Sequence, residues 1–71
     1  MKPLTRPELD ELERVIDSHS MADVLNALEI IANEKAEHVE SNWQDMPLGK
    51  AWRNMAKWLD RAGSEARSIG L

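Results

Sequence analysis

Apolar residues recur every three or four positions through the middle of the chain, from Ser20 to Asn42. This is the period of an amphipathic α-helix, whereas a half-buried strand would alternate apolar and polar residues. The pattern therefore predicts a helix over residues 21–41. Ser20 is its expected N-cap, because a serine hydroxyl accepts a hydrogen bond from a free backbone N–H of the first turn. The predicted apolar stripe contains Met21, Val24, Leu25, Leu28, Ile31, Ala32, Ala36, Val39 and Trp43.

A second amphipathic stretch precedes this helix. Thr5 and Glu8 have the spacing of a capping box, in which the two side chains accept hydrogen bonds from the first free backbone N–H groups. Pro7 is tolerated in a first turn, since the N–H that it lacks would have no partner there. We expect a helix over about residues 6–17, with an apolar side formed by Leu9, Leu12, Val15 and Ile16.

A third helix is predicted from residue 46 to about 62, with Asp45 as N-cap and Pro47 in the first turn. Gly63 is a candidate stop, but the apolar spacing continues beyond it, so an extension to about residue 68 stays open. Gly49 costs about 1 kcal/mol relative to alanine in a helix, and close approach of Trp43 or of the central helix would explain it. The apolar side contains Leu48, Ala51, Trp52, Met55, Leu59 and Ala62, with Trp52 expected in the core and Trp58 at the edge.

The connections between the predicted helices are short, which makes consecutive helices neighbours and favours an antiparallel arrangement. The expected fold class is all-α: a short helix plus a long antiparallel helix hairpin, forming a three-helix bundle. Because the first helix is short, part of the hairpin is expected to stay uncovered. Two such hairpins would form a four-helix core, with the first helix as a buttress, so a homodimer is expected.

Composition limits both stability and partners. The 71 residues form a single domain with a small core, and without cysteine neither a disulfide nor a thiolate metal site can stabilise it. The net charge of -4 disfavours general binding to nucleic acid or anionic membranes. No aliphatic run is long enough to span a membrane. The start of the chain lacks the apolar segment of a secretory signal, so a cytoplasmic protein is expected.

Candidate chemistry is sparse. Glu34 and His38 lie one helical turn apart, but di-iron bundles use Glu-x-x-His and the residue three before His38 is Lys35. A zinc protease helix would need a second histidine. His19 stands between two serines whose expected role is capping. We therefore expect no catalytic residue, no metal and no cofactor, and we interpret the protein as not an enzyme. A metal bundle through Glu34 and His38 would need ligands from a second chain.

Basic residues line one side of the third predicted helix. Their spacing of three and four predicts a basic ridge opposite the apolar side, formed by Lys50, Arg53, Lys57 and Arg61. The favoured interpretation is a solvated face that is paired in part with acidic neighbours. The alternative is a nucleic-acid-binding protein that uses this face.

Three bulky apolar residues stand at or beyond the edges of the predicted stripes. Ile30 lies roughly opposite the centre of its stripe, Trp43 lies at the hairpin bend, and Trp58 lies at the edge of the third helix. Tryptophan is enriched at binding hot spots, although Trp43 has the alternative role of plugging the open end of the bundle. These residues are the candidate partner interface. The sequence predicts a self-associating helical interaction module that binds or regulates another protein.

Overall fold

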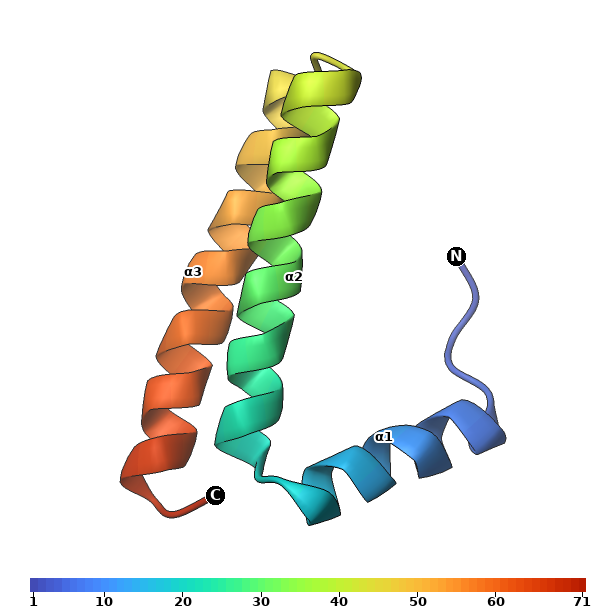
Figure 1. Cartoon of the computed structure of the whole chain (residues 1–71), viewed down its shortest axis with the longest axis vertical. Coiled ribbons are helices and arrows are strands. Elements are labelled where there is room, and N and C mark those ends of the chain that lie inside the picture. Colours follow the sequence, from blue (N-terminus) through green and yellow to red (C-terminus); the bar gives the residue numbers. More distant parts are fainter.

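The protein consists of three helices and no strands. In the computed structural model, which describes all 71 residues, α1 spans Arg6–Ser18, α2 spans Met21–Asn42 and α3 spans Met46–Ser68 (Figure 1). The predicted all-helical fold class is confirmed. The third helix passes through Gly63 without a break.

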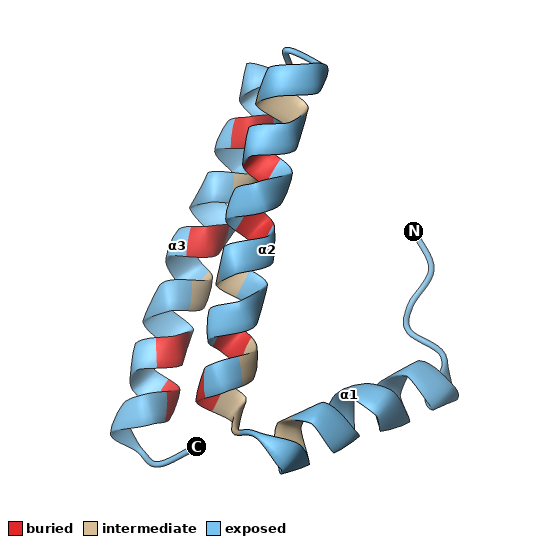
Figure 2. Cartoon of the chain, viewed as in Figure 1, coloured by how far each residue is buried: buried red, intermediate tan, exposed pale blue.

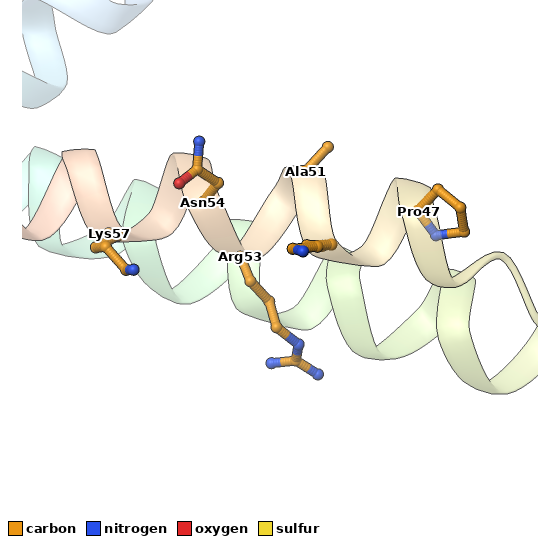
Figure 3. A pocket seen from close by; sticks show the side chains of 6 residues that line it. Pro47, Ala51, Arg53, Asn54 and Lys57 are labelled. Carbon is orange, nitrogen blue, oxygen red and sulfur yellow. The ribbon is translucent and has the colours of Figure 1, made fainter.

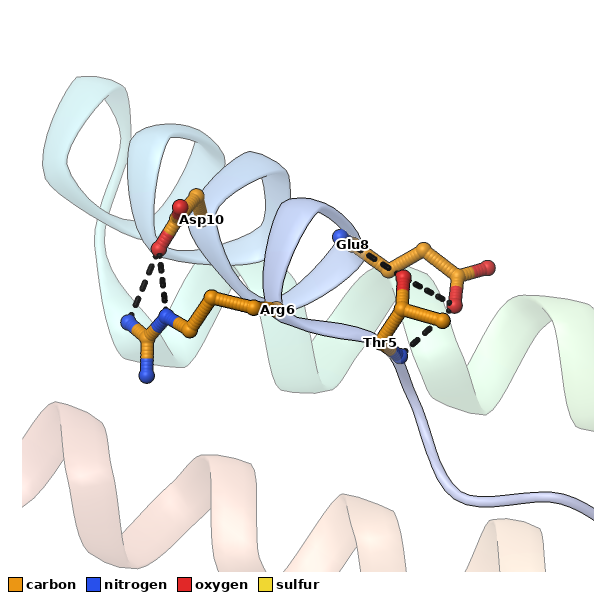
Figure 4. A network of polar contacts seen from close by, with 4 residues as sticks. All are labelled: Thr5, Arg6, Glu8 and Asp10. Carbon is orange, nitrogen blue, oxygen red and sulfur yellow. Dashed lines mark hydrogen bonds and ion pairs between the residues drawn. The ribbon is translucent and has the colours of Figure 1, made fainter.

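α1 begins with the capping box that Thr5 and Glu8 predict. The Glu8 N–H donates to the Thr5 hydroxyl at 3.4 Å, and the Thr5 N–H donates to Glu8 Oε1 at 2.8 Å. The Arg6 guanidinium donates to Asp10 Oδ1 at 2.8 Å, one turn further along (Figure 4). These local contacts order the start of the helix without burying it: α1 has no buried residue (Figure 2).

α2 and α3 are each capped by the expected residue. The Ser20 hydroxyl accepts from the Asp23 N–H, and Asp45 Oδ1 accepts from the Leu48 N–H, both at 3.0 Å. Between the two helices, Gln44 adopts a left-handed φ of 51° in a short turn. The chain reverses there, and α2 and α3 form a long antiparallel hairpin (Figure 1).

A seam of small residues joins α2 to α3. Buried positions recur three, four or seven residues apart on both helices, which is the spacing of a coiled coil. Alanine and glycine predominate, and small side chains allow two helix axes to approach closely. The buried residues are Ala22, Leu25, Ala32 and Ala36 on α2, and Gly49, Ala56, Gly63 and Ala66 on α3 (Figure 2).

The seam uses only part of the apolar arcs that the sequence predicts. Leu28 and Ile31 stay exposed, and Trp52, which was expected in the core, is only half-buried. No large side chain is fully buried anywhere in the chain. Size explains the difference: where the two helices meet through alanine and glycine, they lie too close for most large side chains to fit between them. Leu25, which faces Gly63, is the one leucine buried in the seam.

α1 leaves the foot of the hairpin and points away from it (Figure 1). It contacts α2 near the joint and does not pack on α3. The predicted antiparallel packing of the first two helices is therefore wrong. The joint is the reason: it contains only His19 and Ser20, and Ser20 is fully extended, with φ −170° and ψ 162°, so the chain turns outward instead of back along α2.

The resulting molecule is open rather than compact. Its radius of gyration is 13.9 Å, whereas a compact chain of this length has a radius of about 11 Å. The packed part is the small helical bundle formed by α2 and α3. α1 stands apart with its apolar side uncovered.

Candidate functional site

The hairpin has two unlike faces, one on each side of the seam. On one face Arg53 of α3 forms an ion pair with Glu40 of α2, with N–O distances of 2.8 and 3.2 Å. Asp23, Ile30 and Glu37 are seven residues apart on α2 and so share one side of that helix. Glu37 lies close enough to Arg53 to raise the pKa of its guanidinium, which places that side of α2 on the same charged face.

The opposite face is apolar. In an antiparallel helix pair, the positions that flank the seam on one side of each helix meet on the same side of the pair. A surface depression of about 320 Å³ confirms this pairing, because it is lined by Lys35, His38 and Val39 of α2 together with Leu48 and Trp52 of α3. We call this surface the apolar face and define it by Val24, Leu28, Ile31, Leu48, Met55 and Trp58.

Most of the apolar face is open to solvent. Ile31 is 47% exposed, Met55 is 51% exposed and Trp58 is 55% exposed. Leu48, Met55, Ala51 and Trp52 also line a smaller depression whose walls are entirely apolar. Scattered apolar residues are normal on a protein surface, whereas large contiguous apolar patches are uncommon on monomeric proteins.

The three candidate interface residues occupy different places. Trp58 belongs to the apolar face, and the Arg61 guanidinium stacks over its ring at 5.1 Å. Ile30 lies on the charged face. Trp43 is 73% exposed, so it does not plug the end of the bundle. It follows the last residue of α2 and lines the depression of about 320 Å³ together with Leu48 and Trp52, and its indole N–H donates to His38 Nε2 at 3.4 Å.

The basic ridge is partly engaged within the chain. Arg53 is paired with Glu40 and Arg61 stacks on Trp58, which leaves Lys50 and Lys57 without an ion pair. Lys50, Arg53 and Lys57 border an open depression of about 540 Å³ on the outer side of α3 (Figure 3). One of the four side chains, Arg53, pairs with an acidic residue of α2, which agrees with a solvated face that is paired in part.

Hydrogen bonds and ion pairs shift the pKa values of Glu40, Arg53 and Glu8. The hydrogen bond from Arg53 lowers the pKa of the Glu40 carboxyl below its ordinary value of 4.5, and the same contact raises the pKa of Arg53. In α1, the hydrogen bonds from the Thr5 backbone and hydroxyl lower the pKa of Glu8. All three groups belong to a helix cap or a surface ion pair.

The histidine and acidic side chains are not grouped as metal ligands. There is no group of three or more histidine, cysteine, aspartate or glutamate side chains near enough to hold a metal ion. Instead, the His38 ring contacts Asn42 at 2.8 Å and the Trp43 indole. None of the helices combines the length and apolar character needed to cross a bilayer.

Two features of this surface are absent from the sequence predictions. The first is the Glu40–Arg53 ion pair, whose members are 13 positions apart. The second is the division of each apolar arc between a seam and an open face. The spacing of Gly49, Ala56 and Gly63, seven residues apart, was the available signal for the seam.

Comparison with models of protein families, with curated proteins and with solved structures yields no match to this chain. The surface itself must therefore carry the argument about function.

Proposed function

We propose that this protein is a non-enzymatic helical interaction module, which self-associates through the apolar face of the α2–α3 hairpin and in that form binds or regulates another protein. The observation that carries the proposal is the uncovered apolar face. Burying a large aliphatic or aromatic side chain stabilises a structure by about 1.5–3 kcal/mol, and here the large side chains of the apolar face other than Val24 remain 41–55% exposed.

The exposed area supports self-association. The chain exposes 5833 Å² of accessible surface, whereas a compact monomer of its mass, 8.1 kDa, exposes about 4500 Å². The excess of roughly 1300 Å² is larger than the ~800 Å² that each partner buries in a standard interface. A dimer would therefore remove the excess and bring the surface of each chain close to that of a compact protein.

Ile30 and Ile31 provide a matched test of this proposal. They are adjacent, of one residue type, and similarly exposed at 51% and 47%, but they lie about 100° apart around α2 and on different faces. Ile31→Glu is expected to convert a dimer into a monomer in sedimentation velocity, because it places a charge inside an apolar interface. Ile30→Glu is expected to leave the dimer intact.

Two results would count against the proposal. A chain that sediments as a monomer at every concentration, with no second protein bound, would remove it. Dissociation by Ile30→Glu but not by Ile31→Glu would move the interface to the charged face and agree with the sequence-based candidate Ile30.

The basic ridge provides the competing function, a nucleic-acid binder. The observation in its favour is the pair of unengaged lysines, Lys50 and Lys57, beside the depression on α3. Binding of this kind would weaken steeply with salt and with neutralisation of these lysines. Failure to retard DNA or RNA at low salt would exclude it.

A further inference from the structure

We infer that α1 is an exchanged arm: it packs its apolar side against the α3 half of the apolar face of a second copy of this chain, and not against its own hairpin. The inference rests on the proposed self-association and specifies how the two chains engage. The arm is defined as α1, Arg6–Ser18.

α1 needs a partner to be a stable helix. It has 13 residues and none of them is buried, and isolated helices of about 12–15 residues are marginal in water. Its apolar side remains open, with Leu9, Leu12 and Val15 exposed by 41–46%. The capping box orders its first turn, but caps alone do not cover an apolar side.

The joint directs this helix away from its own hairpin. Both residues of the joint are used in capping: the His19 N–H donates to the Val15 and Ile16 carbonyls at the end of α1, and the Ser20 hydroxyl caps α2. Folding α1 back along α2 would require different backbone dihedral angles at His19 or Ser20, the two residues of the joint. The outward direction is therefore built into the joint, and another molecule must cover the arm.

Charge favours α3 as the surface that receives the arm. α1 carries five acidic and two basic residues, a net charge of -3, whereas α2 carries -4 and α3 carries +3. An arm lying along a partner's α2 would meet like charge. An arm lying over Met55 and Trp58 would instead place its carboxylates beside Arg61, which stacks on Trp58.

A second copy fits this site better than an unrelated helix. Each chain has one acidic arm and one apolar face with a basic edge, so two chains related by a two-fold axis make the same contact twice. The arm is about 20 Å long and α3 about 35 Å long, so the arm fits within the length of the helix that receives it. The excess exposed surface is also of the size that a dimer buries.

Disulfide trapping tests the exchange, because the chain has no native cysteine. Leu12→Cys and Met55→Cys are placed on separate chains, mixed at equal amounts, unfolded, refolded together and oxidised. The expected product is a heterodimer that joins the two variants, identified by intact mass. Ile30→Cys replaces Met55→Cys in the control, and this mixture is expected to give several-fold less heterodimer, since Ile30 lies on the charged face.

The double variant Leu12→Cys/Met55→Cys distinguishes an arm that packs on the partner chain from an arm that packs on its own hairpin. Intrachain closure, seen as an oxidised monomer that has lost two hydrogens, would overturn the exchange. A charge swap gives a second measurement: Glu13→Lys and Arg61→Glu are each expected to raise the dimer Kd about three-fold, and the two together to recover it. Absence of recovery, together with absence of the heterodimer, would also overturn the exchange.

These results distinguish the exchange from the proposed function. If the native chain is a dimer that Ile31→Glu dissociates, but the Leu12–Met55 heterodimer does not form, self-association stands and the exchange of α1 fails. If the native chain is monomeric, both fail.

Discussion

Glu40 combines two roles within the hairpin. Its carboxylate accepts from Arg53 across the two helices, and its side chain covers the position where Gly49 has no Cβ. This contact explains why residue 49 is a glycine. The sequence predicted a close approach by Trp43 or by the central helix, and the Glu40 side chain of the central helix makes that approach.

The ion pair predicts a dependence of stability on pH. The pKa of Glu40 is lower in the folded chain than its ordinary value of 4.5, so the pair contributes fully above that value and its contribution is lost as the pH falls through the lowered pKa. Below about pH 4.5 the thermal midpoint is therefore expected to fall. Glu40→Gln should lower the midpoint at pH 7 and make this fall shallower, measured by circular dichroism.

Glu34→Gln is the matched control for this titration. Glu34 is also an acidic residue of α2, but it is exposed and forms no ion pair. Its substitution should leave the pH profile unchanged. If Glu34→Gln and Glu40→Gln change the profile equally, the acid sensitivity comes from the total charge of α2 and not from the Arg53 contact.

At the scale of the helices, the two seam glycines of α3 give a prediction that the sequence could not make. A Cβ at Gly63 would meet only Leu25 Cβ, at an ordinary 3.7 Å, whereas a Cβ at Gly49 would collide with the Glu40 side chain. Gly63→Ala is therefore expected to stabilise the hairpin by about 0.5–1 kcal/mol, because alanine favours a helix over glycine.

Gly49→Ala is not expected to stabilise the hairpin as Gly63→Ala does. Alanine there must displace Glu40 and thereby disturb the pair with Arg53. Urea unfolding of the two variants measures the difference. Equal stabilisation by both alanines would show that Glu40 moves aside freely, and would make the seam more tolerant at Gly49 than the structure indicates.

Much of the helical structure was predictable because its signals are local. Each helix begins after an N-cap residue: Thr5, Ser20 or Asp45. Each cap accepts a hydrogen bond from a residue only one turn away, so it can be read from a short stretch of sequence. The direction of α1 was not predictable, because it depends on the backbone conformation of Ser20. The same holds for the seam: the arcs of Leu28 and Met55 show that both helices are amphipathic, but not which part of each arc faces the other helix.

The candidate surface was predictable only in part. Trp58 was identified from its position at the edge of an apolar stripe, and it lies on the apolar face. Ile30 was selected because it breaks the pattern of its helix, and that same feature places it away from the other apolar residues. Ile31 and Met55 were assigned to apolar stripes without a choice between interior and interface, since periodicity cannot distinguish the inside of one chain from the contact between two.

At the scale of the whole molecule, an open shape with uncovered apolar surface makes stability depend on concentration. If two chains cover each other's apolar surface, the free energy of unfolding of the dimer changes by about 1.4 kcal/mol for each tenfold change in chain concentration. The thermal midpoint is then expected to fall by about 5 °C per tenfold dilution, because a change of this size shifts the midpoint of a small domain by several degrees.

Calorimetry or circular dichroism over two decades of concentration measures this effect. Ile31→Glu serves as the reference, since a variant unable to dimerise should have a midpoint that is low and independent of concentration. A native midpoint that does not move with dilution would show that the hairpin is stable alone and that its apolar face serves only a partner of another kind.

The two unlike faces of the hairpin have a last consequence for recognition. When the apolar faces of two chains are turned inward, the charged faces are turned outward and every outer feature is present twice, related by symmetry. A client protein with two matching docking points would then hold the pair by both at once, and its avidity would exceed the affinity of either point by orders of magnitude. If the proposed dimer binds another protein, that partner is expected to be two-fold symmetric or to carry a repeated motif.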